Sequence, residues 1–318
     1  MRRVMIPFYL TLFCGWPQLA QAQQPPSRPP VIDVHLHAMG VEALRNFGPN
    51  PITRAAPPRS VEEHVRRTLA EMQKYNVVLG IVGGTNACPG NCGEDVARFV
   101  AAAPERVWGS AAFGRPDLDV DSLRAQYAAR KILAMGEVLA QYEGLSPSDS
   151  AFEPYWDLAE KLDIPVGIHT GLSFPGITQR GAPNFRVAYG DPMLLEGMLN
   201  RHPKLRVFIM HGGHPFLAET LGILHIYPQV YVDIAIIDWG QPREEFYAWL
   251  KALIRAGFAD RIMFGSDQMV WPDAIGLAIN AIESAEFLTA QQKRDIFYNN
   301  AARFLKLSPE IIARHHGH

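Results

Sequence analysis

Short apolar runs alternate with longer amphipathic segments along most of the chain, from residue 31 to about residue 307. Repeated strand-helix units of this kind build a parallel sheet that is covered by helices. Eight apolar runs, most of them rich in β-branched or small residues, are predicted to be strands: 31–37, 77–83, 107–114, 132–138, 165–170, 206–211, 230–235 and 261–267. Eight such units predict an α/β fold of the (β/α)8 or TIM-barrel type.

The segments between the predicted strands have the periodicity of helices. In 60–75 apolar residues recur every three or four positions, and Ser60 with Glu63 three residues later predicts a capping box at its start. Further helices are predicted at 151–162, 191–200, 215–225, 243–256, 273–284 and 289–305. The stretch 172–190, after the fifth strand, lacks such a pattern. A loop of this length inside a compact domain is usually functional, and we expect it over the barrel mouth.

The first 22 residues are typical of a signal peptide. A basic start at 1–3 precedes a largely apolar run at 4–16, and Ala-Gln-Ala at 20–22 resembles a signal-peptidase site. We expect cleavage after Ala22 and export to the periplasm or the medium, followed by a Pro-rich tether at 23–30. The apolar run is shorter than the ~20 residues of a membrane-spanning helix, although a retained N-terminal anchor is the alternative.

Composition and charge narrow the class of partner. The chain has 318 residues, of which 48% are hydrophobic and 19% charged, and this is typical of a globular enzyme. One barrel domain at 31–307 accounts for most of it, with a frayed C-terminal tail at 308–318. A net charge of −2 without a long run of Lys or Arg argues against nucleic acid and anionic membranes as partners. We expect a small-molecule substrate and no stable membrane insertion, and the sequence leaves a homo-oligomer open.

Two cysteines lie close together after the second predicted strand. Cys88 and Cys92 enclose Pro-Gly-Asn, whereas the third cysteine, Cys14, lies in the predicted signal peptide. In an exported chain such a pair favours a short disulfide. Two free thiols or a soft-metal site are the alternatives, but a pair without further Cys or a nearby His is a weak metal signature.

Ionisable residues gather at the predicted ends of four strands. His35 and His37 stand two apart at the end of the first strand, so both imidazoles point to the same side and could bind one ion. His169 ends the fifth strand, His211 the sixth and Asp267 the eighth. The C-terminal ends of barrel strands meet at one mouth, where catalytic groups of this fold gather. We therefore expect these five side chains to converge.

The same positions carry a family resemblance. The segments that resemble signature sequences of the amidohydrolase-related family are Val-Ile-Asp-Val-His-Leu-His at 31–37, Gly-Ile-His-Thr at 167–170, His-Gly-Gly at 211–213 and Phe-Gly-Ser-Asp at 264–267. The segment 299–305 is similar to the one that commonly closes members of this family. The resemblance extends over about 31–307. It implies a TIM barrel with a divalent ion, most often zinc.

The resemblance also implies roles for these residues. His35, His37, His169 and Asp267 would be the metal ligands, with His211 as a further ligand or a catalyst. By donor chemistry alone, imidazoles with one carboxylate also suit Mn, Fe or Ni. Glu137 ends the fourth strand, where two-metal hydrolases of the family carry a bridging carboxylate. One ion is preferred over two, with Glu137 then orienting a ligand or binding substrate.

Several residues beyond the strand ends are candidates for substrate binding from their position alone, with an ordinary surface location as the alternative. They are Asn86, Arg115, Tyr142, Arg180, Trp239 and Trp271. Arginine and tryptophan around the mouth would suit a planar, acidic or aromatic substrate.

Two reactions fit this set of residues. Members of the family include hydrolases of amides, lactones or esters and decarboxylases of aromatic or unsaturated acids. We favour hydrolysis, in which Asp267 takes a proton from water and His211 polarises the substrate carbonyl. A metal-dependent decarboxylase is the alternative. A non-catalytic binding barrel is disfavoured, because none of the five groups is missing.

Overall fold

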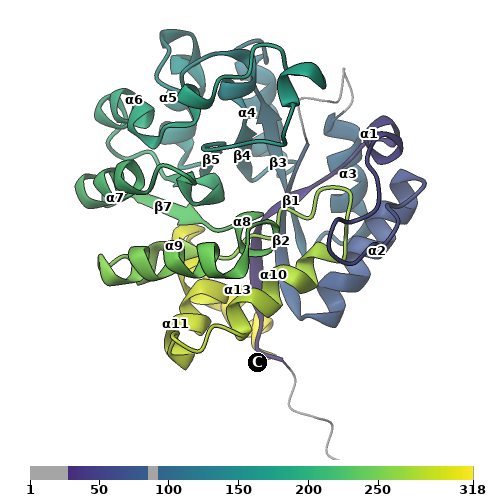
Figure 1. The fold of residues 1–318 in the computed structure, drawn as a ribbon. Helices are drawn as coiled ribbons and strands as arrows, with labels where there is room; N and C mark the ends of the chain where they lie inside the picture. Colours follow the sequence, from purple (N-terminus) through teal and green to yellow (C-terminus); the bar gives the residue numbers. More distant parts are fainter. Residues whose placement is uncertain (1–27, 85–91, 318) are drawn as a thin grey trace, which may run out of the picture.

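The computed structural model describes residues 28–84 and 92–317, and within them eight parallel strands lie side by side in chain order. Helices surround this sheet, from α2 and α3 at the first strands to α9 and α10 at the last (Figure 1). The predicted (β/α)8 barrel is confirmed. The strands are β1 (Val31–His37), β2 (Val77–Gly83), β3 (Val107–Phe113), β4 (Ala134–Val138), β5 (Val166–Ile168), β6 (Val207–Ile209), β7 (Val230–Asp233) and β8 (Ile262–Met263).

The helices follow the strands, with additional short ones at the loops. They are α1 (Val41–Asn46), α2 (Val61–Lys74), α3 (Cys92–Ala102), α4 (Val120–Ala128), α5 (Glu153–Leu162), α6 (Glu196–Arg201), α7 (Leu217–Ile226), α8 (Ile237–Gly240), α9 (Arg243–Arg255), α10 (Ala274–Glu283), α11 (Ala290–Arg294), α12 (Asn300–Phe304) and α13 (Pro309–His315). A π-helical turn at Asp295–Asn299 joins α11 to α12 within the segment that was predicted as one helix.

Three strands that were predicted to carry a site residue at or near their end stop before it. The apolar runs suggested that β5, β6 and β8 continue to the site residues, but their ladders stop at Ile168, Ile209 and Met263. For β6 and β8, backbone conformation keeps the strand from reaching the site residue: His211 and Asp267 have φ angles of 59° and 44°, in the left-handed region, where an extended strand cannot continue. The backbone therefore turns where the side chains must enter the site.

Helix α2 shows how the amphipathic pattern was realised. The Ser60 hydroxyl accepts a hydrogen bond from the Glu63 amide, as predicted. The reciprocal half of the capping box is not formed, because the Glu63 carboxylate accepts from the amide of Arg59 instead. The buried face of the helix includes Val65 and Met72, as the periodicity requires, and also the polar side chain of His64.

The apolar core has two parts. The larger cluster fills the space between sheet and helices and contains the fully buried side chains of Met72, Trp156 and Phe246. The smaller cluster joins Ile32 and Phe208 of the sheet to Phe304 of α12. This second cluster packs the sheet against the end of the chain.

The C-terminal tail is a correction. Residues 309–315 form helix α13, which begins at Ser308 as its N-cap, instead of a frayed end. The phenol of Tyr298 lies 3.0 Å from Nδ1 of His315, and Ile311 and Ile312 pack against the smaller core cluster. Partial burial of two isoleucines and a capped start account for the helix.

Some predictions lie outside the described residues: the signal peptide, the tether up to residue 27, Asn86 and Cys88. Cys92 begins α3, but its side chain is not described, so the disulfide stays a prediction. None of the helices in the described part of the chain is both long and apolar enough to span a membrane.

Candidate metal centre

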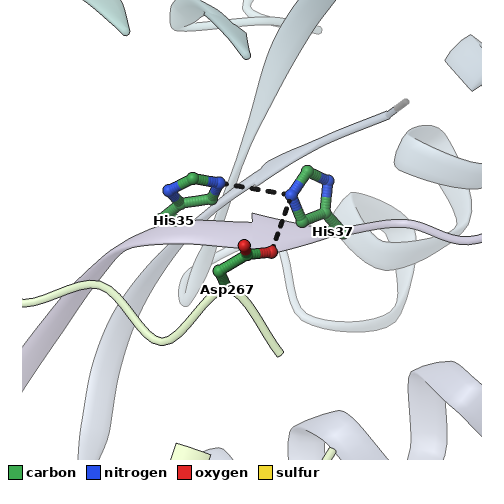
Figure 2. Close-up of side chains that lie close together, drawn as sticks. All are labelled: His35, His37 and Asp267. Carbon is green, nitrogen blue, oxygen red and sulfur yellow. Dashed lines mark hydrogen bonds and ion pairs between the residues drawn. The ribbon is translucent and has the colours of Figure 1, made fainter. Parts of the chain in front are cut away.

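Three predicted ligands meet where the first and last strands come together. Nε2 of His35 lies 3.2 Å from Nε2 of His37, and the latter lies 3.0 Å from Oδ1 of Asp267 (Figure 2). All three side chains are buried, and one ligand atom of each lies within 4.8 Å of the others. The same-side prediction for the two histidines is confirmed. Two imidazoles and a carboxylate are in mutual contact here. A divalent ion bound between their ligand atoms would account for this arrangement.

Glu137 lies among four imidazoles. Its Oε1 is 3.0 Å from Nε2 of His211 and 3.5 Å from Nδ1 of His169. Its Oε2 is 3.5 Å from Nε2 of His37 and 4.0 Å from Nε2 of His35. Burial raises the pKa of Glu137, but the surrounding histidines lower it more, so the carboxyl stays ionised well below its usual pKa. Glu137 thus contributes a negative charge at the centre of the site.

His169 fits the role of a metal ligand for a separate reason. Its side chain is buried, and neither ring nitrogen has a hydrogen-bond partner among the described residues. Burial lowers the pKa of His169 to about 3, so the imidazole is neutral and keeps a lone pair for an ion. The ring is held by Tyr142, with 4.9 Å between ring centroids. A buried imidazole without a partner is costly unless something binds it, and a divalent ion fits.

Sequence reasoning missed one residue, Asp233, which ends β7. Its Oδ2 lies 2.9 Å from Nδ1 of His35, and its Oδ1 accepts hydrogen bonds from the amides of His211 and Ala235. A carboxylate on one ring nitrogen places the proton there and leaves Nε2 free for an ion. Asp233 lies two positions before the end of the predicted seventh strand, 230–235, and only the structure shows that β7 ends there.

His211 and Asp267, the two residues with predicted catalytic roles, differ in charge. Burial lowers the pKa of His211, but its bond to Glu137 and the charge of Asp267 raise it more, to about 9. Burial raises the pKa of Asp267, but His35 and His37 lower it more, so this carboxyl is ionised. In this arrangement His211 carries a proton and Asp267 can accept one.

A pocket of about 700 Å³ opens above these groups. His37, Glu137, His169, His211 and Asp267 lie at its inner end, and the loop 172–190 supplies part of its wall, as expected. Such a volume suits a small-molecule ligand.

Most, but not all, of the residues predicted to bind substrate line this pocket. Tyr142, Arg180, Trp239 and Trp271 line the pocket, and so does His214. Arg115 does not line it: its exposed guanidinium is bonded 2.6 Å away to the carboxylate of Glu143, which does. Arg115 therefore lies beside the pocket wall, held by a residue that belongs to it.

The comparisons with known proteins show which family the chain belongs to. The family model described as amidohydrolase matches residues 32–307. The chain belongs to the amidohydrolase family. Its resemblance to that family, inferred from the strand-end motifs, is confirmed. A curated relative, protein fluG of Emericella nidulans, is 20% identical over 171 residues, and the match covers 48% of this chain but 19% of that protein, so the chain spans only a small part of its length.

Solved structures with a similar fold come from proteins with several different activities. An uncharacterised TIM-barrel protein from Bordetella bronchiseptica is 20% identical, with a TM-score of 0.64 over 87% of this chain and 98% of that one. A probable 2-pyrone-4,6-dicarboxylic acid hydrolase from Acinetobacter baumannii is 16% identical, with a TM-score of 0.63 over 87% and 99%. A 2,6-dihydroxybenzoate decarboxylase is 16% identical, with a TM-score of 0.61 over 88% and 99%. At these identities the likeness shows the fold alone.

Proposed function

We propose that this amidohydrolase is a metal-dependent hydrolase of a small-molecule amide, lactone or ester. The observation that carries the proposal is geometric. A carboxylate oxygen of Asp267 lies 4.0 Å from Nδ1 of His211, Nε2 of His211 is bonded to Glu137 at 3.0 Å, and these groups lie at the inner end of a pocket of about 700 Å³. Hydrolysis of an acyl bond needs both a proton acceptor for water and a donor toward the carbonyl oxygen. One site here offers both.

His35, His37, His169 and Asp267 would hold the divalent ion. Bound there, the ion would act as a Lewis acid and lower the pKa of water toward ~7. Asp267 then accepts the proton of the attacking water, and His211 donates a hydrogen bond to the carbonyl oxygen. Glu137, already bonded to His211, keeps this imidazole protonated and oriented.

We propose one ion per chain. Two groups of three residues could each hold an ion, His35 with His37 and Asp267, and His35 with Glu137 and His211. Both groups need Nε2 of His35, because Nδ1 is bonded to Asp233. A single ring nitrogen has one lone pair, so the two positions cannot be filled through His35 at the same time. Zinc and manganese both suit this donor set, and a related dihydroxybenzoic acid decarboxylase was solved with manganese.

A decarboxylase is the second candidate, and the pocket wall favours it. The rings of Phe174, Phe47, Trp271 and Trp239 form a row in which neighbouring centroids lie 5.7, 5.5 and 6.2 Å apart. Aromatic walls bind flat rings well, and Arg180 is the one Arg or Lys among the described residues that line the pocket. In that reaction the substrate carboxylate leaves as carbon dioxide, and the carbon that keeps the electron pair takes a proton.

The test compares two substrate panels on protein loaded with zinc or manganese. Lactones and esters are followed by the fall in pH, and hydroxybenzoates by release of carbon dioxide. We expect hydrolysis, with Asp267→Asn and His211→Asn reducing it by about 10²-fold or more. The exposed His225 provides the matched control, His225→Asn, which should keep full activity. Carbon dioxide release without hydrolysis would favour the second candidate, and full turnover by either site variant would contradict the assigned roles.

A further inference from the structure

The three clustered ligands straddle the seam of the barrel, which we define as the contacts between residues 33–37 and residues 264–268. Strand β8 is two residues long, so the seam is closed mostly beyond it. The amide of Val34 donates to the carbonyl of Phe264 at 3.0 Å, and the amide of Asp267 donates to the carbonyl of His35 at 2.9 Å. These contacts fix His35 relative to Asp267, but they do not reach His37.

Gln268 closes the seam at His37. Its Nε2 donates to the carbonyl oxygen of His37 at 2.8 Å, and its Oε1 accepts from the amide of the same residue at 2.9 Å. A side-chain amide offers one acceptor and a donor in the same plane, as a peptide group does. The fully buried Gln268 thus takes the place of a backbone partner that the short last strand does not supply.

The backbone around Gln268 is unusual in a way that needs such support. Asp267 before it and Met269 after it have φ angles of 44° and 50°. Residues other than glycine rarely adopt this left-handed conformation. Where they do, contacts with surrounding residues hold them in it. This turn places the Asp267 carboxylate 3.0 Å from Nε2 of His37. The two bonds of Gln268 tie the turn to the backbone of His37.

We propose that Gln268 is a positioning residue that holds His37 and Asp267 in register for the divalent ion. Its amide bonds to the backbone of His37 and does not line the pocket, so it contacts neither substrate nor ion. The inference rests on the metal site of the proposed function. It adds that affinity for the ion depends on a residue that is not a ligand.

The test separates positioning from general stability. Gln268→Met keeps the size of the side chain and removes both bonds. Asn300→Leu is the matched control, because Asn300 is also a fully buried amide whose Nδ2 donates to backbone carbonyls, those of Ala259 and Ile262 at the start of β8. For each folded protein, urea unfolding of the metal-free form and the dissociation constant for zinc, by competition with a chromogenic chelator, are measured.

We expect both variants to unfold more easily and only Gln268→Met to bind zinc more weakly, by about 10- to 100-fold. If Gln268→Met does not fold, Gln268→Glu keeps the acceptor for the His37 amide and loses the donor, and it should show a smaller loss of affinity. Equal zinc affinity in wild type and both Gln268 variants, or an equal loss in Asn300→Leu, would overturn the inference. A wild type that binds no zinc would instead overturn the metal site itself, and this inference with it.

Discussion

At the residue scale, the ring nitrogens of His169 have no hydrogen-bond partner among the described residues, and a bound ion would remove the free-energy cost of this. An unsatisfied buried polar group costs about 1–3 kcal/mol. Leucine fills a similar volume without polar atoms. His169→Leu should therefore make the metal-free protein more stable, by about 1 kcal/mol, while abolishing its gain in stability on adding metal. A bound ion at 100 times its dissociation constant stabilises a protein by about 2.7 kcal/mol.

The measurement is the free energy of urea unfolding with and without added zinc, for wild type and His169→Leu. The two expected changes have opposite signs, so loss of folding cannot imitate them. A variant that is less stable without metal and still gains stability with zinc would show that His169 is an ordinary core residue.

Asp233 leads to a prediction about a proton. In Asp233→Asn the side-chain oxygen can still accept from the amides of His211 and Ala235. The side-chain nitrogen would face Nδ1 of His35 and donate to it, which moves the imidazole proton to Nε2 and removes the lone pair there. We expect zinc affinity to fall by about 10- to 100-fold with little change in unfolding free energy.

Competition with a chelator measures this affinity, and Asp260→Asn, at an exposed aspartate, is the control. Unchanged zinc binding in Asp233→Asn would mean that His35 is not a ligand through Nε2.

At the scale of elements, helix α2 carries a buried histidine whose charge state links stability to pH. Burial lowers the pKa of His64 to about 4, below the value of 6.5 that is expected in the unfolded chain. As pH falls from 6.5 to 4 the unfolded chain takes up a proton that folded His64 does not, so stability falls over that window by about 3 kcal/mol. His64→Leu should remove this part of the pH dependence, whereas His225→Gln, at an exposed histidine, should keep it.

Urea unfolding at several pH values between 4 and 6.5 measures the slope for each variant. Equal slopes in wild type and His64→Leu would show that His64 is not the group responsible.

Element types followed from the sequence more readily than their ends. Alternation of apolar runs and amphipathic segments predicted all eight strands, because burial of a parallel sheet demands it. The early ends of β6 and β8 were not predictable, because His211 and Asp267 adopt left-handed backbone that neither side chain favours locally. Helix α13 was missed because it is also stabilised by contacts with the smaller core cluster and with Tyr298, 17 positions before His315. Tertiary contacts decide such elements.

The site was predictable to the extent that strand-end position determines it. His35, His37, His169, His211 and Asp267 meet at one end of the barrel because parallel strands bring their C-terminal ends there. Arg115 follows a strand as well, yet its partner Glu143 lies on another loop, and only the folded chain brings the two together. The role of Gln268 could not be predicted from the sequence for a similar reason, since its two hydrogen bonds join residues 231 positions apart.

At the scale of the whole molecule, one claim supports the rest: the barrel brings together ligands from distant strands to hold a single divalent ion. Metal content of the purified chain, by plasma mass spectrometry after loading with zinc or manganese and removal of excess, tests it most directly. We expect about one ion per chain in wild type and well under half of that in His37→Ala, because His37 is the ligand with the most contacts to the others. Two ions per chain would contradict the argument from the shared Nε2 of His35, and a wild type that retains no ion would contradict the metal centre.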